Sequence, residues 1–251
     1  VAPITLEILA KARELADTVE AFVGGAADGI AATLGAHGAT KVLATGDLDG
    51  GLQGVHVAAA LTAAIEGGDA PDAIFFGTTY DGRDIAGRLS VKLDKPVISN
   101  NTDVELDGDA LAVSTPIFGG TQIVKTKFAA GAPALALFRP KSFVAEETGG
   151  GAAEVAALAT VDTGAAGAAK VLDRHVEETS GPKLDEADIV VAGGRGLGES
   201  DKFDMIETLA KLLKGAPGAS RAIVDAGWVP YAYQVGQTGK VVKPTVYVAA
   251  G

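Results

Sequence analysis

IVVAGGRG, at residues 189–196, joins a short apolar run to a loop of glycines. A segment of helix length, residues 201–214, follows it. A second glycine loop, GASR at 218–221, then leads into another apolar run, AIV at 222–224. This order predicts a βαβ unit, in which a helix joins two parallel strands. Open α/β sheets hold ligands at the loops beyond the carboxyl ends of their strands. We therefore expect a binding site in the last quarter of the chain.

A third glycine loop, QVGQTG at 234–239, completes the set. Glycines let the backbone approach a ligand closely, and the side chains beside them add charge and hydrogen-bonding groups. The candidate binding residues in the three loops are Arg195, Ser220, Arg221, Val235, Gly236, Gln237 and Thr238. The glycines alone are weak evidence, because 193–196 lacks the G-x-G-x-x-G spacing of the dinucleotide fingerprint and no loop ends in Gly-Lys-Ser/Thr.

SRAIVDAG at 220–227, followed by QVGQTGK at 234–240, resembles the FAD-binding signature of the electron transfer flavoprotein alpha-subunit family (ETF-alpha/FixB). GGRGL at 193–197, with Phe203 after it, resembles the upstream loop of that family. The resemblance runs across nearly the whole chain. It is highly specific in the last quarter, where three separated motifs agree in order and spacing. In the first half it rests mainly on the pattern of strands and helices.

The resemblance implies an α/β fold of two Rossmann-like domains with parallel sheets. Residues 1–178 would form an N-terminal α/β domain with an added antiparallel section, and residues 185–251 an incomplete FAD-binding domain, with a hinge near 177–185. The family has a strand before the helix that opens this chain and more strand-and-helix units after Gly251. We therefore expect a sequence truncated at both ends, with part of the flavin site outside it.

The first half of the sequence alternates apolar strand-like runs with helix-like segments, which indicates a parallel sheet covered on both faces. Strands are expected at 19–23, 41–44, 73–76 and 97–99, and helices at 26–34, 55–65 and 84–93, after a first helix that Thr5 caps. An Asp-Gly turn at 107–108 predicts a hairpin of 104–106 with 110–114. Residues 122–128 and 134–138 are expected as further strands of an antiparallel section, before two extended runs at 155–161 and 169–176.

The resemblance also implies a role for each candidate. Arg221 would lie against the isoalloxazine ring of FAD, and Ser220 would hydrogen-bond the flavin or a phosphate. Arg195 would approach the cofactor, residues 235–238 would offer backbone N–H groups, and Thr238 would lie near the redox-active nitrogen. A guanidinium favours the negatively charged reduced ring. Unit charges 4 Å apart interact by ~1–4 kcal/mol, which is roughly 40–170 mV for one electron.

Each of these roles has a plainer alternative in the residues themselves. Arg221 could form a surface ion pair with Asp225, and Arg195 could pair with Glu199. Ser220 could be an ordinary turn residue, and the third loop could be a simple glycine turn between strands.

Loops built from arginines and hydroxyls, without acid–base machinery, favour a redox carrier over an enzyme. The resemblance implies the FAD-binding subunit of a heterodimer with an electron transfer flavoprotein beta subunit, in which AMP is possible. It would accept electrons from flavin dehydrogenases, such as those acting on acyl-CoA in fatty acid beta-oxidation, and pass them to the membrane-associated ETF-quinone oxidoreductase. Its compartment would be the bacterial cytoplasm or the mitochondrial matrix. The alternatives are a nicotinamide- or flavin-dependent oxidoreductase of the same fold and a regulatory or structural nucleotide-binding module.

Acidic residues exceed basic ones, 32 to 21, and the formal net charge is −11. Because no basic run is present, no nucleic-acid binding is expected. The acidity fits solubility, steering toward a basic partner or adaptation to salt. No apolar segment reaches the ~20 residues of a membrane span, so no membrane insertion is expected. No leader is visible, although a chain that begins at Val1 could have lost one.

Other chemistry finds little support. The lack of cysteine excludes disulfides, cysteine-bound clusters and thiol nucleophiles. The three histidines, His37, His56 and His175, have no ligand spacing, so no metal site is expected. GTTYDGRD at 77–84 follows an expected strand and opens a helix. It could bind an anion there, or Asp81 or Asp84 could simply cap the helix. Trp228 and Tyr231 are expected in the core or at an interface.

Overall fold

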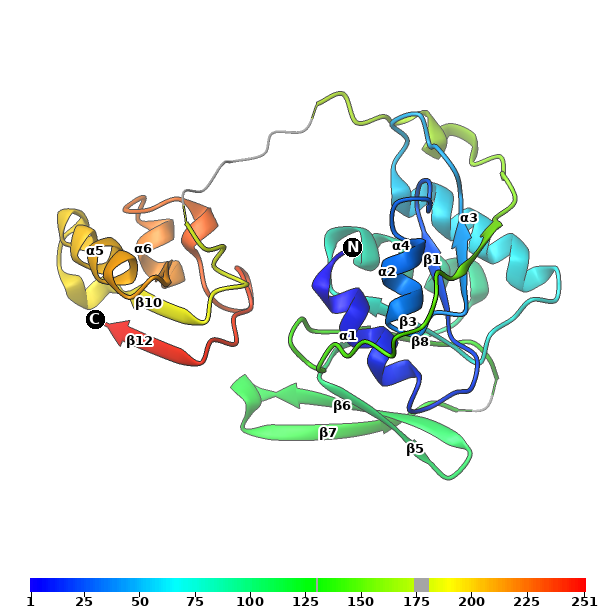
Figure 1. Ribbon diagram of the computed structural model, residues 1–251, viewed down its shortest axis with the longest axis horizontal. Coiled ribbons are helices and arrows are strands. Elements are labelled where there is room, and N and C mark those ends of the chain that lie inside the picture. Colours follow the sequence, from blue (N-terminus) through cyan, green and yellow to red (C-terminus); the bar gives the residue numbers. More distant parts are fainter. Residues whose placement is uncertain (130, 174–180) are drawn as a thin grey trace. The chain divides into compact units, whose positions relative to one another are not determined.

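The computed structural model describes residues 1–129, 131–173 and 181–251 in two compact units, Val1–Arg174 and His175–Gly251 (Figure 1). Each unit has its own sheets and its own apolar clusters. None of the helices in the described ranges is both long and apolar enough to cross a membrane.

The first unit alternates strands and helices. Its helices are α1 (Pro3–Ala12), α2 (Ala31–Ala36), α3 (Gln53–Glu66) and α4 (Tyr80–Leu93). Its strands are β1 (Glu20–Val23), β2 (Lys41–Ala44), β3 (Ala73–Gly77), β4 (Val97–Asn101), β5 (Asp103–Asp107), β6 (Ala110–Ile117), β7 (Gln122–Lys127), β8 (Ala134–Phe138) and β9 (Glu154–Ala157). They form two parallel sheets, β1-β2-β9 and β3-β8-β4, and one antiparallel sheet, β5-β6-β7. The predicted α/β class with an antiparallel section is confirmed.

Strand β8 is the centre of its sheet, and all five of its residues are buried. Successive side chains of a strand point to opposite faces. Leu135 and Leu137 accordingly pack in one cluster with residues of α3 and α4, whereas Ala136 and Phe138 pack in another with residues of α1. Helices thus cover both faces of this sheet, which is why β8 is apolar at every position.

Leu135 has no exposed surface, so Leu135→Ala leaves a cavity in the middle of the core. We expect it to lower the free energy of unfolding of the first unit by about 2–5 kcal/mol, measured by urea denaturation. Leu106→Ala is the matched control, because Leu106 is 53% exposed and its truncation should change stability by less than about 0.5 kcal/mol. Equal effects of the two substitutions would contradict this placement of the core.

The antiparallel sheet begins with the predicted hairpin. Val104 of β5 lies opposite Val113 of β6, and Gly108 in the turn has a φ of +67°, which suits glycine. Two ion pairs connect β5 to β7 across β6. Lys125 Nζ lies 2.5 Å from Glu105 Oε1, and Lys127 forms a similar pair with Asp107. Exposed pairs of this kind add little to stability, so the buried valines hold the sheet on the core.

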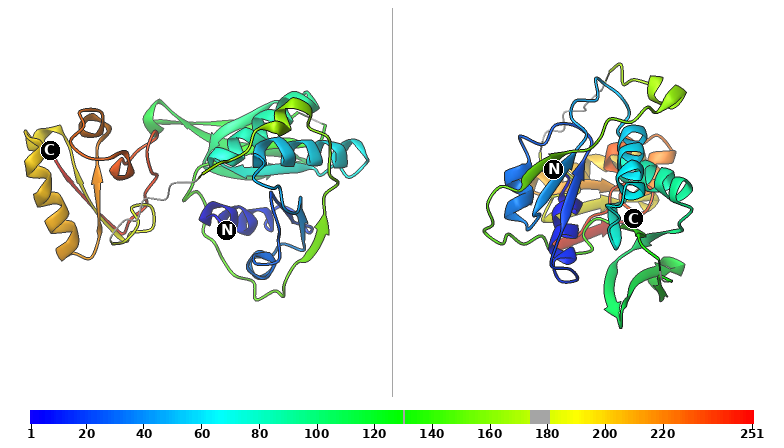
Figure 2. Two further views of the ribbon diagram at one scale, coloured as in Figure 1. Left: turned by 90° about the horizontal axis from the view of Figure 1, so that it is seen from above. Right: turned by 90° about the vertical axis from the view of Figure 1, so that its right-hand side faces the viewer.

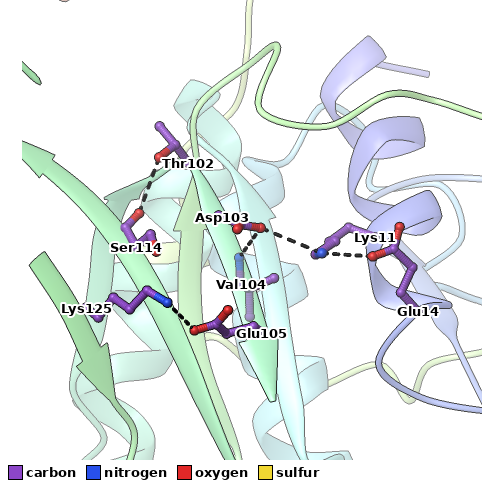
Figure 3. Close-up of polar contacts among 8 residues, drawn as sticks. All are labelled: Lys11, Glu14, Thr102, Asp103, Val104, Glu105, Ser114 and Lys125. Atoms are coloured by element: carbon purple, nitrogen blue, oxygen red, sulfur yellow. Dashed lines mark hydrogen bonds and ion pairs between the residues drawn. The ribbon is translucent and has the colours of Figure 1, made fainter. Parts of the chain in front are cut away.

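Lys11 connects α1 to this sheet. Its Nζ lies 2.8 Å from Glu14 Oε2 and 3.6 Å from Asp103 Oδ1, while Asp103 Oδ1 also accepts the backbone N–H of Val104 at 2.8 Å (Figure 3). The hydrogen bond with Glu14 holds the pKa of Lys11 above its usual value.

Two helices of the first unit begin elsewhere than predicted. Helix α1 begins at Pro3, and its N-cap is Ala2 rather than Thr5. Proline is favoured in the first helical turn because its missing N–H is not needed there. Helix α2 begins at Ala31, later than the expected residue 26. Residues 28–30 form a turn before it.

Helix α4 also begins earlier than predicted, at Tyr80. Thr79 Oγ1 accepts a hydrogen bond from the Gly82 amide at 3.0 Å, so Thr79 is the N-cap. The expectation that Asp81 or Asp84 caps this helix is wrong, because a threonine directly after the strand already satisfies the first turn. Asp84 instead pairs with Arg88 one turn along.

Three strand predictions need correction. Residues 134–138 form a central parallel strand, not part of the antiparallel section, because burial on both faces selects a continuous apolar run. The run at 155–161 forms a strand only over Glu154–Ala157. Residues 169–173 form no strand beyond an isolated bridge of Lys170 with Gly51, and 174–176 lie outside the described residues.

The second unit is built on three parallel strands. They are β10 (Ile189–Gly193), β11 (Ala216–Ala219) and β12 (Val246–Ala250), in the order β11-β10-β12. Helix α5 (Asp204–Leu212) follows β10, and Figure 2 shows it in gold beside the strands. The short α6 (Arg221–Asp225) follows β11. A βαβ unit is therefore present, with its first strand and its helix near the predicted residues 189–192 and 201–214.

The apolar run at 222–224 was predicted as a strand, and it is part of α6 instead. The second strand lies just before it, at Ala216–Ala219, and those four residues already complete the pairing with β10. The chain has left the sheet at Ser220, so Ile223 reaches the core from a helix, with no exposed surface. As a result, Gly218 and Ala219 of the second glycine loop lie in β11, and only Ser220 and Arg221 follow at its carboxyl end.

Candidate functional site

The carboxyl ends of three parallel strands bring the first two loops together. β10, β11 and β12 end at Gly193, Ala219 and Ala250 on one edge of the sheet. The Gly194 amide donates to the Ala250 carbonyl at 2.9 Å, and the Ser220 amide donates to the Gly193 carbonyl at 2.9 Å. The loops that begin at Gly194 and Ser220 are therefore neighbours.

The third loop attaches to the same edge. The Val235 amide donates to the Ala219 carbonyl at 2.9 Å, next to an isolated bridge between Ala219 and Gln234. The loop closes on itself, because the Gly236 amide donates to the Lys240 carbonyl at 3.1 Å and the Lys240 amide donates to the Gln234 carbonyl at 2.8 Å. It is a compact, internally bonded loop.

Gly239 has no room for a side chain in this loop. A Cβ on Gly239 would lie 2.3 Å from the Gln234 carbonyl oxygen and 2.8 Å from its carbonyl carbon. Gly236 has a φ of +128°, which other residues rarely adopt. The glycines that mark this loop are thus required by its backbone.

Ser220 carries a buried hydroxyl without a partner. Its Oγ is buried, and it makes no hydrogen bond within the described residues. Buried hydroxyls almost always have a partner. Gly194 lies beside it, since a Cβ built on that glycine would lie 3.6 Å from Ser220 Oγ. Ser220 is the N-cap residue of α6, but its side chain makes no capping hydrogen bond.

The two arginines are both exposed but differ in their contacts. Arg221 Nε donates to Asp225 Oδ2 at 3.0 Å, and the two side chains are 64% and 61% exposed. The alternative in which Arg221 pairs with Asp225 is therefore observed. Arg195 forms neither an ion pair nor a side-chain hydrogen bond with any described residue, so its possible pair with Glu199 is absent.

Several backbone N–H groups of the loops also lack acceptors. Among the described residues, the amides of Arg195 and Gly196 in the first loop, and of Gln237 and Thr238 in the third, donate to no protein acceptor. All four residues are exposed, whereas Val235 is half-buried. Together with the guanidinium group of Arg195, which has no acidic partner among the described residues, these amides make the edge rich in hydrogen-bond donors, which suits an anionic ligand.

Comparison with known proteins shows which family the chain belongs to. Residues 183–251 match the family model described as "Electron transfer flavoprotein FAD-binding domain", and residues 1–163 match the one described as "Electron transfer flavoprotein domain". The chain belongs to the electron transfer flavoprotein alpha-subunit family. The resemblance carried by residues 193–197, 220–227 and 234–240 is confirmed.

Two of the relatives in this family match nearly the whole chain. The electron transfer flavoprotein subunit alpha of Syntrophomonas wolfei subsp. wolfei is 36% identical over 250 residues, which cover 99% of this chain and 78% of the relative. Protein FixB of Clostridium saccharobutylicum is 32% identical over 255 residues, covering 99% and 76%. The probable mitochondrial electron transfer flavoprotein subunit alpha of Caenorhabditis elegans is 40% identical over 180 residues, covering 71% and 52%.

Three residues that support the third loop in this electron transfer flavoprotein subunit were not among the candidates. Gln234 and Tyr231 hydrogen-bond Thr238. Tyr233 packs edge-on to Phe203 and donates its hydroxyl hydrogen to Glu207 at 3.2 Å, and burial raises the pKa of Tyr233. No spacing in the sequence points to them, because Gln234 and Tyr231 meet Thr238 only once the loop is closed.

The remaining expectations about this subunit are mixed. Trp228 lies against the core of the second unit, as predicted. Tyr231 is 55% exposed and so lies outside the core, and its place at an interface stays a prediction. Nowhere in the described residues do three His, Asp or Glu side chains gather as a metal site would require. The loop at 77–84 shows a helix cap and no additional feature that points to an anion.

Proposed function

We propose that the carboxyl edge of β10 and β11 binds FAD and that the chain is the redox subunit of an electron transfer flavoprotein. The family match over 183–251 supports a flavin. The observation that carries the site is the buried, unpartnered Ser220 hydroxyl at the meeting point of the loops. A hydroxyl that has lost water and found no protein partner is compensated once a ligand bonds to it.

The residues of the edge fit the chemistry of this cofactor. FAD combines two phosphates with a ring whose nitrogens and oxygens accept hydrogen bonds. Arg195 and Arg221 supply positive charge, and the amides of Gln237 and Thr238 supply donors. Ser220 supplies the buried hydroxyl. Val235 and Gly236 would place the third loop against the cofactor through their backbone.

Bound FAD supplies the redox chemistry, and the chain binds, orients and electrostatically biases it. We infer that the subunit pairs with an electron transfer flavoprotein beta subunit, which holds AMP. In this scheme it receives electrons from flavin dehydrogenases, such as those acting on acyl-CoA, and delivers them to ETF-quinone oxidoreductase. It turns over no substrate of its own. The compartment is the bacterial cytoplasm, or the mitochondrial matrix in a eukaryote.

Ser220→Ala tests whether the buried Ser220 hydroxyl binds FAD, because the substitution should weaken FAD binding and yet stabilise the protein without FAD. We expect FAD affinity to fall by roughly 3- to 10-fold as one hydrogen bond is lost. Without FAD, the free energy of unfolding of the second unit should rise by about 1 kcal/mol, because an unsatisfied buried group is removed. FAD titration followed by flavin fluorescence, and urea denaturation, measure the two quantities.

Ser200→Ala is the control, since Ser200 is exposed and its hydroxyl bonds the neighbouring Asp201. It should change neither quantity. A Ser220→Ala protein that loses stability and keeps its FAD affinity would show that the hydroxyl serves the fold instead of the cofactor.

A further inference from the structure

The tip of the third loop, residues 236–239, receives one hydrogen bond from outside the loop. The Tyr231 hydroxyl donates to the Thr238 carbonyl oxygen at 2.5 Å. Among the described residues, no other hydrogen bond reaches 236–239 from outside 234–240. The remaining bonds of the tip are internal to the loop, such as the one from the Gly239 amide to the Gly236 carbonyl at 3.1 Å. The Tyr231 hydroxyl therefore links the tip to the rest of the second unit.

The backbone that carries Tyr231 is itself fixed. Tyr231–Tyr233 is a turn of 3-10 helix, in which the Tyr233 amide donates to the Pro230 carbonyl at 3.1 Å and the Gln234 amide donates to the Tyr231 carbonyl at 2.9 Å. The Tyr233 ring packs edge-on against Phe203, which is 3% exposed. A side chain on an anchored turn can restrain a loop, because its own backbone no longer has to be ordered.

Packing does not account for the tyrosine at position 231. Its side chain is 55% exposed, and it belongs to neither apolar cluster of the described second unit. Solvation does not account for it either, because Thr238 is exposed and water would satisfy its carbonyl oxygen. What the hydrogen bond adds is a restraint on the tip.

This restraint matters for the two free donors of the tip. The amides of Gln237 and Thr238 have no protein acceptor in the described chain, so they serve a ligand only while the tip is closed. A protein whose binding-competent form is partly populated binds with an affinity reduced by that fraction. An exposed tip with few bonds opens easily, so a restraint from outside the loop raises the competent fraction and with it the affinity.

We propose that Tyr231 is a positioning residue that holds residues 236–239 in the shape that binds FAD before FAD arrives. This inference rests on the proposed FAD site, and it requires no contact between Tyr231 and the cofactor. The hydroxyl acts through the loop. Loss of the hydroxyl should therefore loosen the tip and weaken FAD binding together.

Tyr231→Phe tests this inference, because it removes the hydroxyl and keeps the ring. In the intact protein purified with the partner that accompanies it, we expect FAD binding to weaken by roughly 2- to 10-fold, the range for one hydrogen bond. Without FAD, exchange of the Gly236 and Gly239 amides, which are hydrogen-bonded in the closed loop, should become faster by a similar factor. Flavin fluorescence titration and hydrogen–deuterium exchange measure the two quantities.

Ile206→Val is the control for a general loss of stability. Ile206 lies in the core of the second unit and is 4% exposed, so its truncation should destabilise that unit. It should nevertheless leave both the FAD affinity and the exchange of the tip unchanged, because it does not touch the third loop. Circular dichroism shows whether each variant is folded.

Parental exchange at the tip of a folded Tyr231→Phe protein would overturn this inference, because any loss of affinity would then come from a direct contact of the hydroxyl with FAD. Faster exchange with parental affinity would overturn it as well, because FAD would not need the closed tip. Both results leave the FAD site standing. A parent protein that binds no FAD would overturn the proposed function, and the inference with it.

Discussion

Replacing Gly239 by alanine should weaken FAD binding by roughly 5- to 150-fold, corresponding to about 1–3 kcal/mol of forced displacement. The new Cβ would lie 2.3 Å from the Gln234 carbonyl oxygen, a backbone atom that cannot rotate away. That oxygen accepts the Lys240 amide at 2.8 Å, in a bond that closes the loop. The loop must therefore open, and the donors of Gln237 and Thr238 move with it. FAD titration of the purified variant measures the loss.

Gly87→Ala is the matched control for this glycine. Gly87 lies in α4 of the first unit, and a Cβ there meets nothing within 4 Å. The substitution should leave FAD affinity unchanged and stabilise the helix by about 0.5–1 kcal/mol. Circular dichroism shows whether each variant is folded. Parental affinity in a folded Gly239→Ala protein would show that the closed loop does not contribute to the site.

Arg221→Ala should lower the first reduction potential of the bound flavin by roughly 40–170 mV, the range for a unit charge about 4 Å from the ring. Solvent around this exposed side chain favours the lower end of that range. The guanidinium favours the negatively charged reduced ring, so its loss disfavours reduction. The substitution also leaves Asp225, now without its ion pair, as an uncompensated negative charge. Asp225→Asn should therefore act in the opposite direction and raise the potential, because it leaves Arg221 uncompensated.

Potentiometric titration of the FAD-bound protein measures these shifts. Arg221→Lys keeps the positive charge and should change the potential less than Arg221→Ala does. Lys211→Ala controls for net charge, because Lys211 lies in the last turn of α5, which leads back to the amino edge of the sheet. If Arg221→Ala and Lys211→Ala shifted the potential equally, the effect would come from net charge, and Arg221 would have no place beside the ring.

The strand pattern of the first unit could be predicted from the sequence where burial alone decides it. Residues 41–44 and 134–138 match their observed strands residue for residue. The sheet to which 134–138 belongs could not be predicted, because position in the chain suggested the antiparallel section. A run that is apolar at every position is the physical signal for a central parallel strand. For residues 134–138 this signal predicts the correct sheet, whereas their nearness in the chain to the hairpin does not.

The candidate site could be predicted from the sequence in its loops, and less so in the contacts of its side chains. Apolar content placed a strand at 222–224, whereas the register with β10 is already complete at Ala219. Thr79, and not Asp81 or Asp84, caps helix α4, because Thr79 directly follows strand β3 and its hydroxyl reaches the first turn. The support that Gln234 gives to Thr238 depends on how the loop closes, which local sequence preference does not encode. Motifs thus identified the loops, and the geometry identified the residues that hold them.

Hydrogen–deuterium exchange of the intact protein, with and without FAD, tests the central claim most directly. If the carboxyl edge of β10 and β11 holds the cofactor, FAD should slow exchange in three separate segments, residues 194–197, 219–222 and 235–239. Exchange at 77–84 of the first unit should stay unchanged. Tight FAD binding that leaves those three segments exchanging at their original rates, with protection elsewhere, would contradict the account.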